Sequence, residues 1–402
     1  MGKTLYQASR QAREIFEEAG EALKIDLKKY IFEGTEEQLR QTEITQPAIL
    51  TTSVAYFRFY LQEGKFPLPQ YLAGHSLGEY TALCCAGALS LDQAVRLVNR
   101  RGQLMQEATG GAEADMIAVD GIKAWQVEEA CAKQQTSGTP CVWIAAYNSG
   151  GQIVVAGHRQ AVTEIAATLK TLGAEIMPLK VSAAFHTPLM TPAADRLLET
   201  LSECTIAPLR CQVLSNVTGL PYRNENEVKE GLYRQMTSPV QWAASVEFLY
   251  RAGVYYFIDA GPRKLLRNQL KRQGWNAEYF ALEAAEDLTA FGNSIGSHLP
   301  ALATPVNKAL ALAVSAKNYN YDDAGYEESV LSPFRKIKEL LEKAELSSRL
   351  PVKEEMTEAC GQLHRLLRGK RLQEEEITQQ YDRLFTETGV LLVCPELKAA
   401  LV

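Results

Sequence analysis

The sequence predicts an α/β protein that carries a small inserted α+β subdomain and a helical C-terminal extension. Three observations support this fold class. A short apolar strand runs into a glycine turn and then into helices near residue 74, short strands alternate with helical patterns between about 116 and 182, and charged helical sequence follows residue 300. The 402 residues suffice for about two or three domains.

The first part of the chain opens with two expected helices, over residues 5–19 and 46–63. Residues 71–73 form an expected apolar strand that ends at Gly74. Beyond the turn, apolar residues from Leu91 to Met105 recur at helical spacing. The order of strand, sharp turn and helices indicates an α/β core.

Short strands then mark the inserted subdomain. Four are expected, over residues 116–119, 142–146, 153–156 and 176–179. Between the last two, apolar residues from Val162 to Leu172 form one face of a helix that ends at Gly173, a residue suited to close a helix.

The remaining sequence returns to α/β units, with strands expected near Val213 and over residues 257–259, and then changes to charged helices over residues 334–346, 354–367 and 372–385. We therefore predict a discontinuous core of residues 1–115 and 183–299, a subdomain of residues 116–182, and a helical extension or linker of residues 300–402. The apolar stripes of the extension are interpreted as packing faces without a catalytic role.

Composition and charge exclude several classes of function. A net charge of −6 argues against nucleic acid as a partner, because phosphate binding favours a basic excess. The eight cysteines include no C-x-x-C pair, so neither a zinc site nor a redox motif is indicated. No apolar stretch is long enough for a membrane span, and the acidic amino terminus lacks a signal-peptide core. We expect a cytoplasmic protein.

A candidate nucleophile lies in the run Gly74-His75-Ser76-Leu77-Gly78. This run fits G-x-S-x-G, in which a serine occupies a strained strand-to-helix turn with its hydroxyl exposed. The alternative is an ordinary glycine-rich turn. The expected strand before the turn and helix after it favour the catalytic interpretation.

A serine hydroxyl needs a base to take its proton, and the chain has five histidines. His75 adjoins the serine and is expected to point to the opposite side of the turn. His158 follows an expected strand of the subdomain, and His298 and His364 lie at or beyond the end of the core. His186, at an expected loop-to-helix junction, is the best candidate. It follows Ser76 by 110 residues with much of the core still to come, an order that disfavours an ordinary esterase of the α/β hydrolase type.

Seven segments occur in a fixed order along the chain, at residues 74–79, 101–106, 147–149 with 151–152, 185–190, 215–219, 238–242 and 259–262. Taken together, they closely resemble the malonyl-CoA:acyl carrier protein transacylases, especially the stand-alone acyltransferases that serve polyketide synthases in trans. The resemblance implies an α/β-hydrolase-like core with a ferredoxin-like subdomain.

The resemblance also implies the catalytic roles. Ser76 would be the acylated nucleophile, His186 the general base, and Gln241 the residue whose backbone carbonyl orients the imidazole. The backbone amide of Leu77 would donate to the oxyanion.

Three further residues are implied to bind substrate. Arg101 would grip the free carboxylate of malonyl with two parallel hydrogen bonds. Phe185 would crowd a methyl branch on the acyl group, although Ala183 stands where many relatives have histidine. Asn148 matches a position near the site entrance and is equally well explained as a turn residue.

Two features leave alternatives open. The basic residues Arg263, Lys264, Arg267, Lys271 and Arg272 would face an acidic carrier protein or coenzyme A phosphates, or simply form a solvated helix face. Relatives begin with a strand and a Gly-Gln-Gly turn that supplies a second oxyanion donor, whereas the start Met1-Gly2-Lys3 corresponds to sequence after that turn.

The sequence therefore predicts an [acyl-carrier-protein] S-malonyltransferase of polyketide or fatty acid biosynthesis. Malonyl-CoA would be the substrate, the partners would be an acyl carrier protein with its phosphopantetheine and polyketide synthase modules, and no bound cofactor or metal is expected. The alternatives are an acyl hydrolase that proofreads acyl carrier proteins and a non-catalytic carrier-docking protein.

Overall fold

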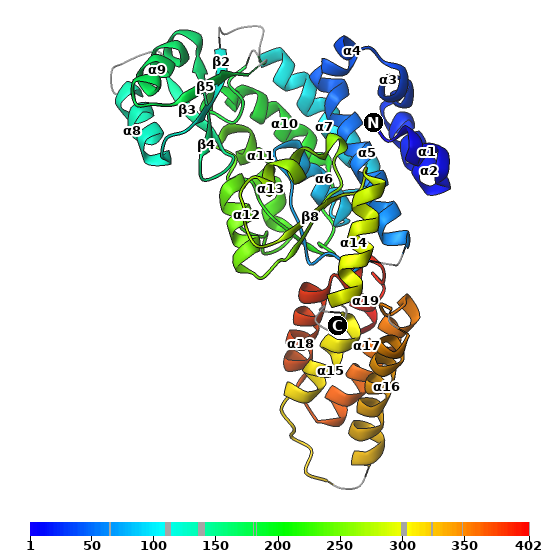
Figure 1. The fold of residues 1–402 in the computed structure, drawn as a ribbon. Coiled ribbons are helices and arrows are strands. Elements are labelled where there is room, and N and C mark those ends of the chain that lie inside the picture. The colour runs from blue at the N-terminus through cyan, green and yellow to red at the C-terminus, as the bar shows by residue number, and fades with distance from the viewer. Residues whose placement is uncertain are drawn as a thin grey trace. The chain divides into compact units, whose positions relative to one another are not determined.

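The computed structural model describes residues 1–63, 66–108, 114–135, 141–179, 181, 183–298, 304–322, 325–347 and 349–401 (Figure 1). The chain forms two compact units. Unit 1 comprises residues 1–56, 73–209 and 213–283, and unit 2 comprises residues 57–72, 210–212 and 284–402. The predicted domain boundaries at residues 182 and 299–300 lie outside the described residues, so the predicted division stays a prediction.

Unit 1 opens with helices. Its helical elements in the described residues are α1 (Lys3–Ala8), α2 (Arg10–Leu23), α3 (Leu27–Glu33), α4 (Glu36–Arg40), the first part of α5 (Thr42–Glu63), α6 (Leu77–Cys85), α7 (Leu91–Glu107), α8 (Ala124–Gln135), α9 (Arg159–Thr171), α10 (Thr191–Glu203), α11 (Asn226–Thr237), α12 (Trp242–Arg251) and α13 (Leu265–Lys271), with short 3₁₀ turns η2 (Pro188–Met190) and η3 (Pro262–Lys264).

The single helix predicted over residues 5–19 is two helices, because Ser9 interrupts it. Ser9 has an extended backbone, and its side chain accepts a hydrogen bond from the Ala12 amide at 3.2 Å. A serine in this position caps the start of a new helix. The break therefore has a local cause in the sequence.

A four-stranded antiparallel sheet forms the inserted subdomain. Its strands are β2 (Ala114–Asp120), β3 (Val142–Tyr147), β4 (Gln152–His158) and β5 (Glu175–Pro178), in the order β3-β4-β2-β5. All four predicted strands are present, and β2 begins before the predicted start of the subdomain at residue 116.

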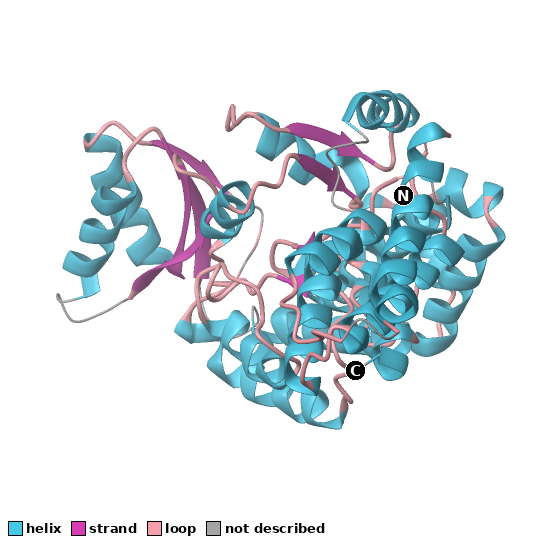
Figure 2. Ribbon diagram, turned by 90° about the horizontal axis from the view of Figure 1, so that it is seen from below, coloured by secondary structure: helices cyan, strands magenta, loops and turns pink. Residues whose placement is uncertain are grey.

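The two faces of this sheet serve different purposes. Alternate residues such as Ile153 and Val155 pack against α8 and α9, which cover one face (Figure 2). Their neighbours Val154 and Ala156 pack into a second cluster with Val240 and Trp242 of the core. This alternation follows from the two-residue period of a strand, and it fixes the subdomain against the core of unit 1.

Outside the subdomain, the described strands form two separate pairs. β1 (Tyr71–Leu72) pairs with β6 (Gln212–Val213), and β7 (Tyr256–Asp259) runs parallel to β8 (Glu278–Ala281). The strand β8 is absent from the sequence prediction. The protein is thus an α/β protein with small sheets, and the hydrolase-like core stays a prediction.

Unit 2 is a helical assembly. It contains α14 (Ala285–His298), α15 (Pro305–Ser315), the π-helical turn η5 (Glu327–Leu331), α16 (Ser332–Leu346), α17 (Lys353–Gly369), α18 (Glu374–Thr388), the 3₁₀ turn η6 (Val390–Leu392) and α19 (Leu397–Leu401).

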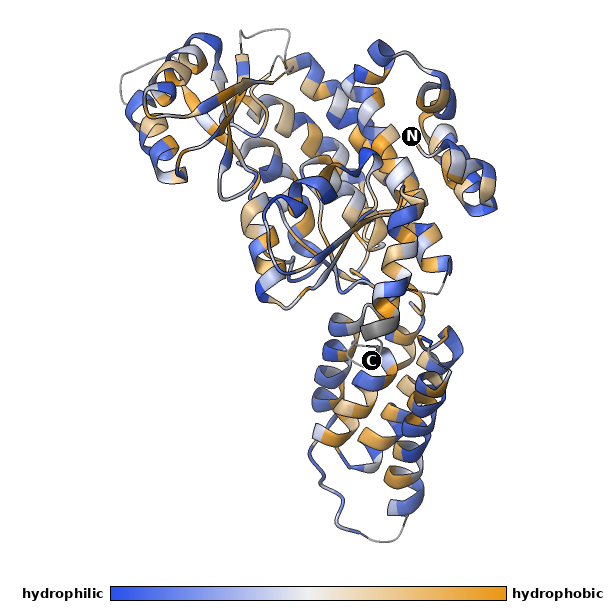
Figure 3. Cartoon of the chain, in the orientation of Figure 1, coloured by the Kyte–Doolittle hydropathy of each residue, from blue (hydrophilic) through white to orange (hydrophobic). Residues whose placement is uncertain are grey.

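The helices of unit 2 are amphipathic, with apolar residues on their inner faces and charged residues outside (Figure 3). The three helices predicted in the extension correspond to α16, α17 and α18, and their apolar stripes form one buried cluster, as the packing interpretation requires. Among the described helices, none combines the length and apolar character needed to span a membrane.

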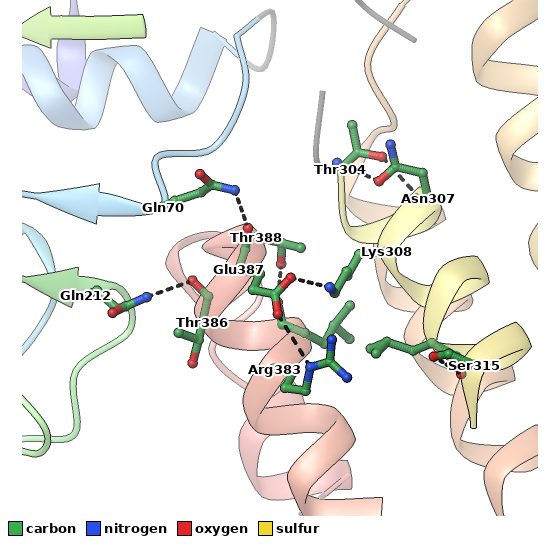
Figure 4. A network of polar contacts seen from close by, with 12 residues as sticks. Gln70, Gln212, Thr304, Asn307, Lys308, Ser315, Arg383, Thr386, Glu387 and Thr388 are labelled. Atoms are coloured by element: carbon green, nitrogen blue, oxygen red, sulfur yellow. Dashed lines mark hydrogen bonds and ion pairs between the residues drawn. The ribbon is translucent and has the colours of Figure 1, made fainter. Parts of the chain in front are cut away.

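Residues 57–72 belong to unit 2 because their side chains pack there. The Phe66 ring stacks against both Tyr60 and Phe291, with ring centroids 5.3 and 5.0 Å away. At the end of α18, Gln70 donates from Nε2 to the Glu387 carbonyl oxygen at 2.6 Å (Figure 4). This bond satisfies one of the carbonyl groups that a helix end leaves without an internal partner.

Two neighbours complete this polar network. Gln212 donates from Nε2 to the Thr386 carbonyl oxygen at 3.5 Å, and the Glu387 carboxylate forms ion pairs with Lys308 of α15 and with Arg383. The end of α18 thereby joins three segments of unit 2 that are distant in sequence.

We expect Gly389→Ala to lower the free energy of unfolding by at least about 1 kcal/mol. Gly389 ends α18 with φ 64°, and an added Cβ would lie 2.2 Å from the Pro69 carbonyl oxygen. The matched control is Gly361→Ala inside α17, where no atom lies within 4 Å of an added Cβ; it should be neutral or stabilising. Urea unfolding followed by circular dichroism measures both variants, and equal midpoints would contradict the expectation.

Candidate active site

Ser76 occupies a sharp turn between β1 and α6. It is the residue before the first turn of α6 and has the unusual dihedral angles φ 52° and ψ −103°. Gly74 makes the turn possible, because a Cβ there would lie 2.1 Å from the Gly78 carbonyl carbon. An added Cβ at Gly78 meets no atom within 4 Å. Of the two glycines in the motif, therefore, only Gly74 has no room for a side chain. Such strain in a non-glycine residue is frequent at functional sites.

Asn216 holds this turn through two hydrogen bonds. Its Oδ1 accepts from the Ser76 amide at 2.6 Å, and its Nδ2 donates to the Gly74 carbonyl oxygen at 2.7 Å. Its side chain is almost fully buried. One amide side chain thus satisfies two backbone groups that the sharp turn removes from regular pairing.

The structure brings Ser76 and His186 together. His186 lies just before η2, also with a positive φ of 60°, and its Nε2 is 2.8 Å from Ser76 Oγ. Its Nδ1 is 2.7 Å from the backbone oxygen of Gln235. Because a carbonyl oxygen only accepts, Nδ1 carries the proton and Nε2 is left to accept the proton of the serine hydroxyl.

The prediction that Gln241 orients the imidazole is wrong. The acceptor at His186 Nδ1 is the Gln235 carbonyl, whereas the Gln241 carbonyl accepts from the Ser245 amide at 3.0 Å in the first turn of α12. Gln235 lies in the last turn of α11, where carbonyl groups have no partner within the helix. A free carbonyl at a helix end is therefore the acceptor for His186.

Burial keeps His186 neutral. Burial first, and then the positive charge of Arg101, lower the pKa of His186 to about 3. A neutral imidazole is the form that can accept a proton. The negative end of α11, which points its free carbonyl at Nδ1, favours the imidazolium that forms during reaction.

His75 bonds to Asn148. Its Nε2 lies 2.8 Å from Asn148 Oδ1, and burial lowers the pKa of His75. Asn148 is held in turn by Gln152. The predicted entrance residue therefore contacts the neighbour of the nucleophile and not the nucleophile itself.

Arg101 of α7 is the third residue at the nucleophile. Its Nη2 lies 2.9 Å from Ser76 Oγ and 3.1 Å from Gln235 Oε1, and its Nη1 lies 2.9 Å from Gln46 Oε1. Only 1% of the residue is exposed. The guanidinium lies over the Tyr80 ring, whose centroid is 5.2 Å from the guanidinium carbon.

Arg101 forms no direct ion pair among the described residues, because its three hydrogen-bond acceptors are neutral; the buried carboxyl group of Glu79 interacts with its charge without direct contact. The Arg101 Nε atom is buried without a hydrogen bond. A buried charge without a direct ion pair is unfavourable, so its presence beside Ser76 indicates a place for an anionic group.

Close helix packing places Arg101 in this position. A Cβ at Gly102 would lie 2.6 Å from the Glu43 Cα, so glycine lets α7 approach α5 until Arg101 reaches Gln46. Asn99 strengthens the contact by donating to the Glu43 carbonyl oxygen at 2.9 Å.

The other two predicted residues flank the reacting groups. Leu77 is the first residue of α6, and the first amide groups of a helix have no acceptor within it. Phe185 precedes His186, is half-buried and packs against the cluster that contains Ala184. Within the described residues, no group of three His, Cys, Asp or Glu side chains is arranged to hold a metal ion.

Sequence reasoning missed the buried polar residues around these groups. Gln235, Gln46, Asn216, Glu79 and Tyr222 are all involved in hydrogen bonds of the site. Glu79 lies inside the nucleophile motif, and Asn216 inside another of the segments used for the resemblance. A search for polar residues at helix ends and in apolar surroundings would have indicated Gln235.

The arrangement can perform nucleophilic acyl transfer. The hydroxyl of Ser76 donates to His186 and accepts from Arg101, which stabilises a developing alkoxide. The start of α6 adds a positive partial charge beside the nucleophile.

Comparison with known proteins agrees with this geometry. The family model described as "Acyl transferase domain" matches residues 1–288. The malonyl CoA-acyl carrier protein transacylase of Bacillus subtilis is 36% identical over 348 residues, which cover 86% of each chain.

Solved structures give the same result. The crystal structure of FabD from Acinetobacter baumannii has a TM-score of 0.69 and 36% identity, covering 73% of this chain and 93% of that one. A malonyl-transacylase in complex with a type II PKS acyl-carrier protein has a TM-score of 0.69 and 34% identity, covering 73% and 94%. This chain therefore belongs to the acyl transferase domain family, among the malonyl CoA-acyl carrier protein transacylases.

Proposed function

We propose that this chain transfers a malonyl group from malonyl-CoA to the phosphopantetheine thiol of an acyl carrier protein, through an ester on Ser76. The observation that carries the proposal is the buried guanidinium of Arg101, which lies 2.9 Å from Ser76 Oγ and forms no direct ion pair among the described residues. A guanidinium in this position can hold the free carboxylate of malonyl with two parallel hydrogen bonds. Acetyl offers no such group.

The first half-reaction forms the ester. His186 Nε2 takes the proton of Ser76, and Oγ attacks the thioester carbonyl carbon. The carbon–sulfur bond then breaks, and His186 returns the proton to the coenzyme A sulfur. In the second half-reaction the carrier thiol loses its proton to His186 and attacks the ester, and Ser76 leaves with that proton.

The developing oxyanion needs a donor in each half-reaction. The Leu77 amide, at the positive end of α6, is suited to this role because it is fixed before the reaction starts. Gln235, through its backbone carbonyl, keeps Nδ1 protonated throughout. Neither step calls for a metal ion or a bound redox cofactor.

The substrate and the carrier would reach the site beside α13. Gln269 of this helix donates to the Asn148 carbonyl oxygen at 3.1 Å, and Asn148 holds His75. Exposed basic residues on and next to the helix, Arg263, Lys271 and Arg272, supply positive charge for an acidic carrier protein. Phe185 would limit the width of the acyl pocket.

The relatives indicate the wider setting. Their names associate them with acyl carrier proteins, in one case that of a type II PKS, so we place this chain in fatty acid or polyketide biosynthesis, with a trans-acting role toward polyketide synthase modules and a cytoplasmic location. The β-α-β-β-α-β order of residues 114–178, with strand order β3-β4-β2-β5, supports a ferredoxin-like subdomain, and the turn at Ser76 supports a hydrolase-like core.

The direct test is the mass of the intact protein after mixing with malonyl-CoA or acetyl-CoA. We expect a malonyl adduct on Ser76, no adduct in Ser76→Ala, and transfer of the adduct to a holo carrier protein. Rapid loss of acetyl to water without a malonyl adduct would indicate an acyl hydrolase. Carrier binding without any adduct would indicate a docking protein, and either outcome would overturn the proposal.

A further inference from the structure

Behind the reacting groups lies a buried carboxyl group that the proposed reaction does not use. Glu79, in the first turn of α6, has no exposed surface. Its Oε2 lies 2.8 Å from Gln235 Nε2, and its Oε1 lies 2.5 Å from the Tyr222 hydroxyl. No ion pair within the described ranges includes this carboxyl group, so its partners are neutral hydrogen-bonding groups.

Gln235 connects Glu79 to the active site. Its Nε2 donates to Glu79 Oε2 and to the Ser76 carbonyl oxygen, both at 2.8 Å. Its Oε1 accepts from Arg101 Nη2 at 3.1 Å, and its backbone oxygen faces His186 Nδ1. A single residue therefore serves the nucleophile, the base and the arginine.

The two acceptors decide which way the Gln235 amide points. The Glu79 carboxylate and the Ser76 carbonyl can only accept from it, so they must face the NH₂ end of the amide. The oxygen end is then left for Arg101. Without the Glu79 acceptor, one amide hydrogen would be buried and unsatisfied, and the Gln235 side chain would lose one of the three hydrogen bonds that hold its oxygen against Arg101.

We propose that Glu79 is a positioning residue for acyl transfer, which acts through Gln235 to fix Arg101 toward the acyl carboxylate and to support the acceptor of His186. The proposal rests on the proposed function, because the oriented arginine matters only for a dicarboxylic acyl group. It assigns a role in selectivity to a residue that touches neither the substrate nor the serine hydroxyl.

The hydrogen bonds work in both charge states of Glu79. Burial raises the pKa of Glu79 to about 7, so both the neutral and the ionised form are accessible near neutral pH. In either form one carboxyl oxygen accepts from Gln235, while the Tyr222 hydroxyl donates or accepts as required. A glutamine at position 79 can make the same pair of bonds, and a leucine can make neither.

The test compares acyl-Ser76 formation from malonyl-CoA and from acetyl-CoA in four variants. Glu79→Leu should lower the malonyl rate by roughly 10- to 100-fold and lower the malonyl-to-acetyl ratio by about tenfold. Glu79→Gln should restore both to within about threefold of wild type, and Tyr222→Phe should leave the ratio unchanged because the Gln235 bond remains. Glu355→Leu, which removes a buried glutamate of unit 2, should lower the unfolding midpoint without changing the ratio.

Each outcome has a defined meaning. A Glu79→Leu variant that folds and keeps the wild-type ratio overturns the proposal, since a role in stability alone would not move selectivity. If Glu79→Leu does not fold, Gln235→Leu decides, because it keeps the backbone carbonyl for His186 and removes the link to Arg101; an unchanged ratio there also overturns the proposal. A wild-type chain that forms no adduct overturns the proposed function itself, and the role of Glu79 with it.

Discussion

His186→Ala should lower the rate of acyl-Ser76 formation by roughly 10⁴- to 10⁶-fold. Ser76 Oγ has two hydrogen-bond partners in the described residues, His186 and Arg101, and only the histidine can accept a proton at neutral pH. Rapid-quench sampling with mass detection of the adduct measures the rate. A loss of less than about tenfold would show that another group acts as the base.

The pH dependence of the wild-type chain gives an independent readout of the same role. In the proposed mechanism the active form of the base is the neutral imidazole, and the pKa of His186 lies well below the ordinary value of 6.5. The rate of acylation should therefore not fall as the pH is lowered from 8 to 5, and should fall only as the pH approaches the lowered pKa. Half-loss of activity near pH 6.5 would contradict a buried, neutral His186.

Gln46→Ala serves as the control for the pH profile. Gln46 bonds to Arg101. Among the described residues, no hydrogen bond joins it to the His186 imidazole. It should leave the pH profile unchanged, even where it alters the absolute rate.

The sequence was sufficient for the parts of the site that short motifs encode. Ser76 follows a glycine that permits a sharp turn, and His186 lies in a loop just before a helix. Both patterns are visible in a few adjacent residues. Arg101 was indicated by the family resemblance and not by a local backbone pattern. The strands of the inserted subdomain were predictable from their apolar runs and the glycine that closes the intervening helix.

The remaining parts depend on where a helix ends in space. Gln235 and Gln241 are close in sequence, and only helix boundaries reveal that one carbonyl is free at the end of α11 while the other is used within α12. The break at Ser9 and the strand β8 were missed because a capping serine and a strand of four residues leave weak signals. Residues 57–72 belong to unit 2 through contacts such as those of Phe66 with Phe291 and of Gln70 with Glu387. These partners are hundreds of residues apart in the sequence, so no local pattern encodes the contacts.

Arg101→Ala should reverse the acyl preference of the chain. The malonyl rate should fall by about 100-fold or more, since a charge-assisted hydrogen bond to a buried carboxylate contributes roughly 1.5–3 kcal/mol and the guanidinium can form two. The acetyl rate should fall less, because acetyl loses only the hydrogen bond from Arg101 to Ser76 Oγ. The ratio of the two rates, measured by adduct formation, is therefore the decisive quantity.

Two variants make this result specific to the guanidinium at position 101. Arg101→Lys keeps the positive charge without the two parallel donors, so its malonyl-to-acetyl ratio should lie between those of wild type and Arg101→Ala. Arg100→Ala removes the neighbouring arginine of α7, which is half-buried and bonds to Gln103, and should leave the ratio unchanged. If Arg101→Ala keeps the wild-type ratio, the acyl carboxylate binds elsewhere. The buried charge would then act on the serine oxygen alone, as an electrostatic partner of the nucleophile that does not distinguish one acyl group from another.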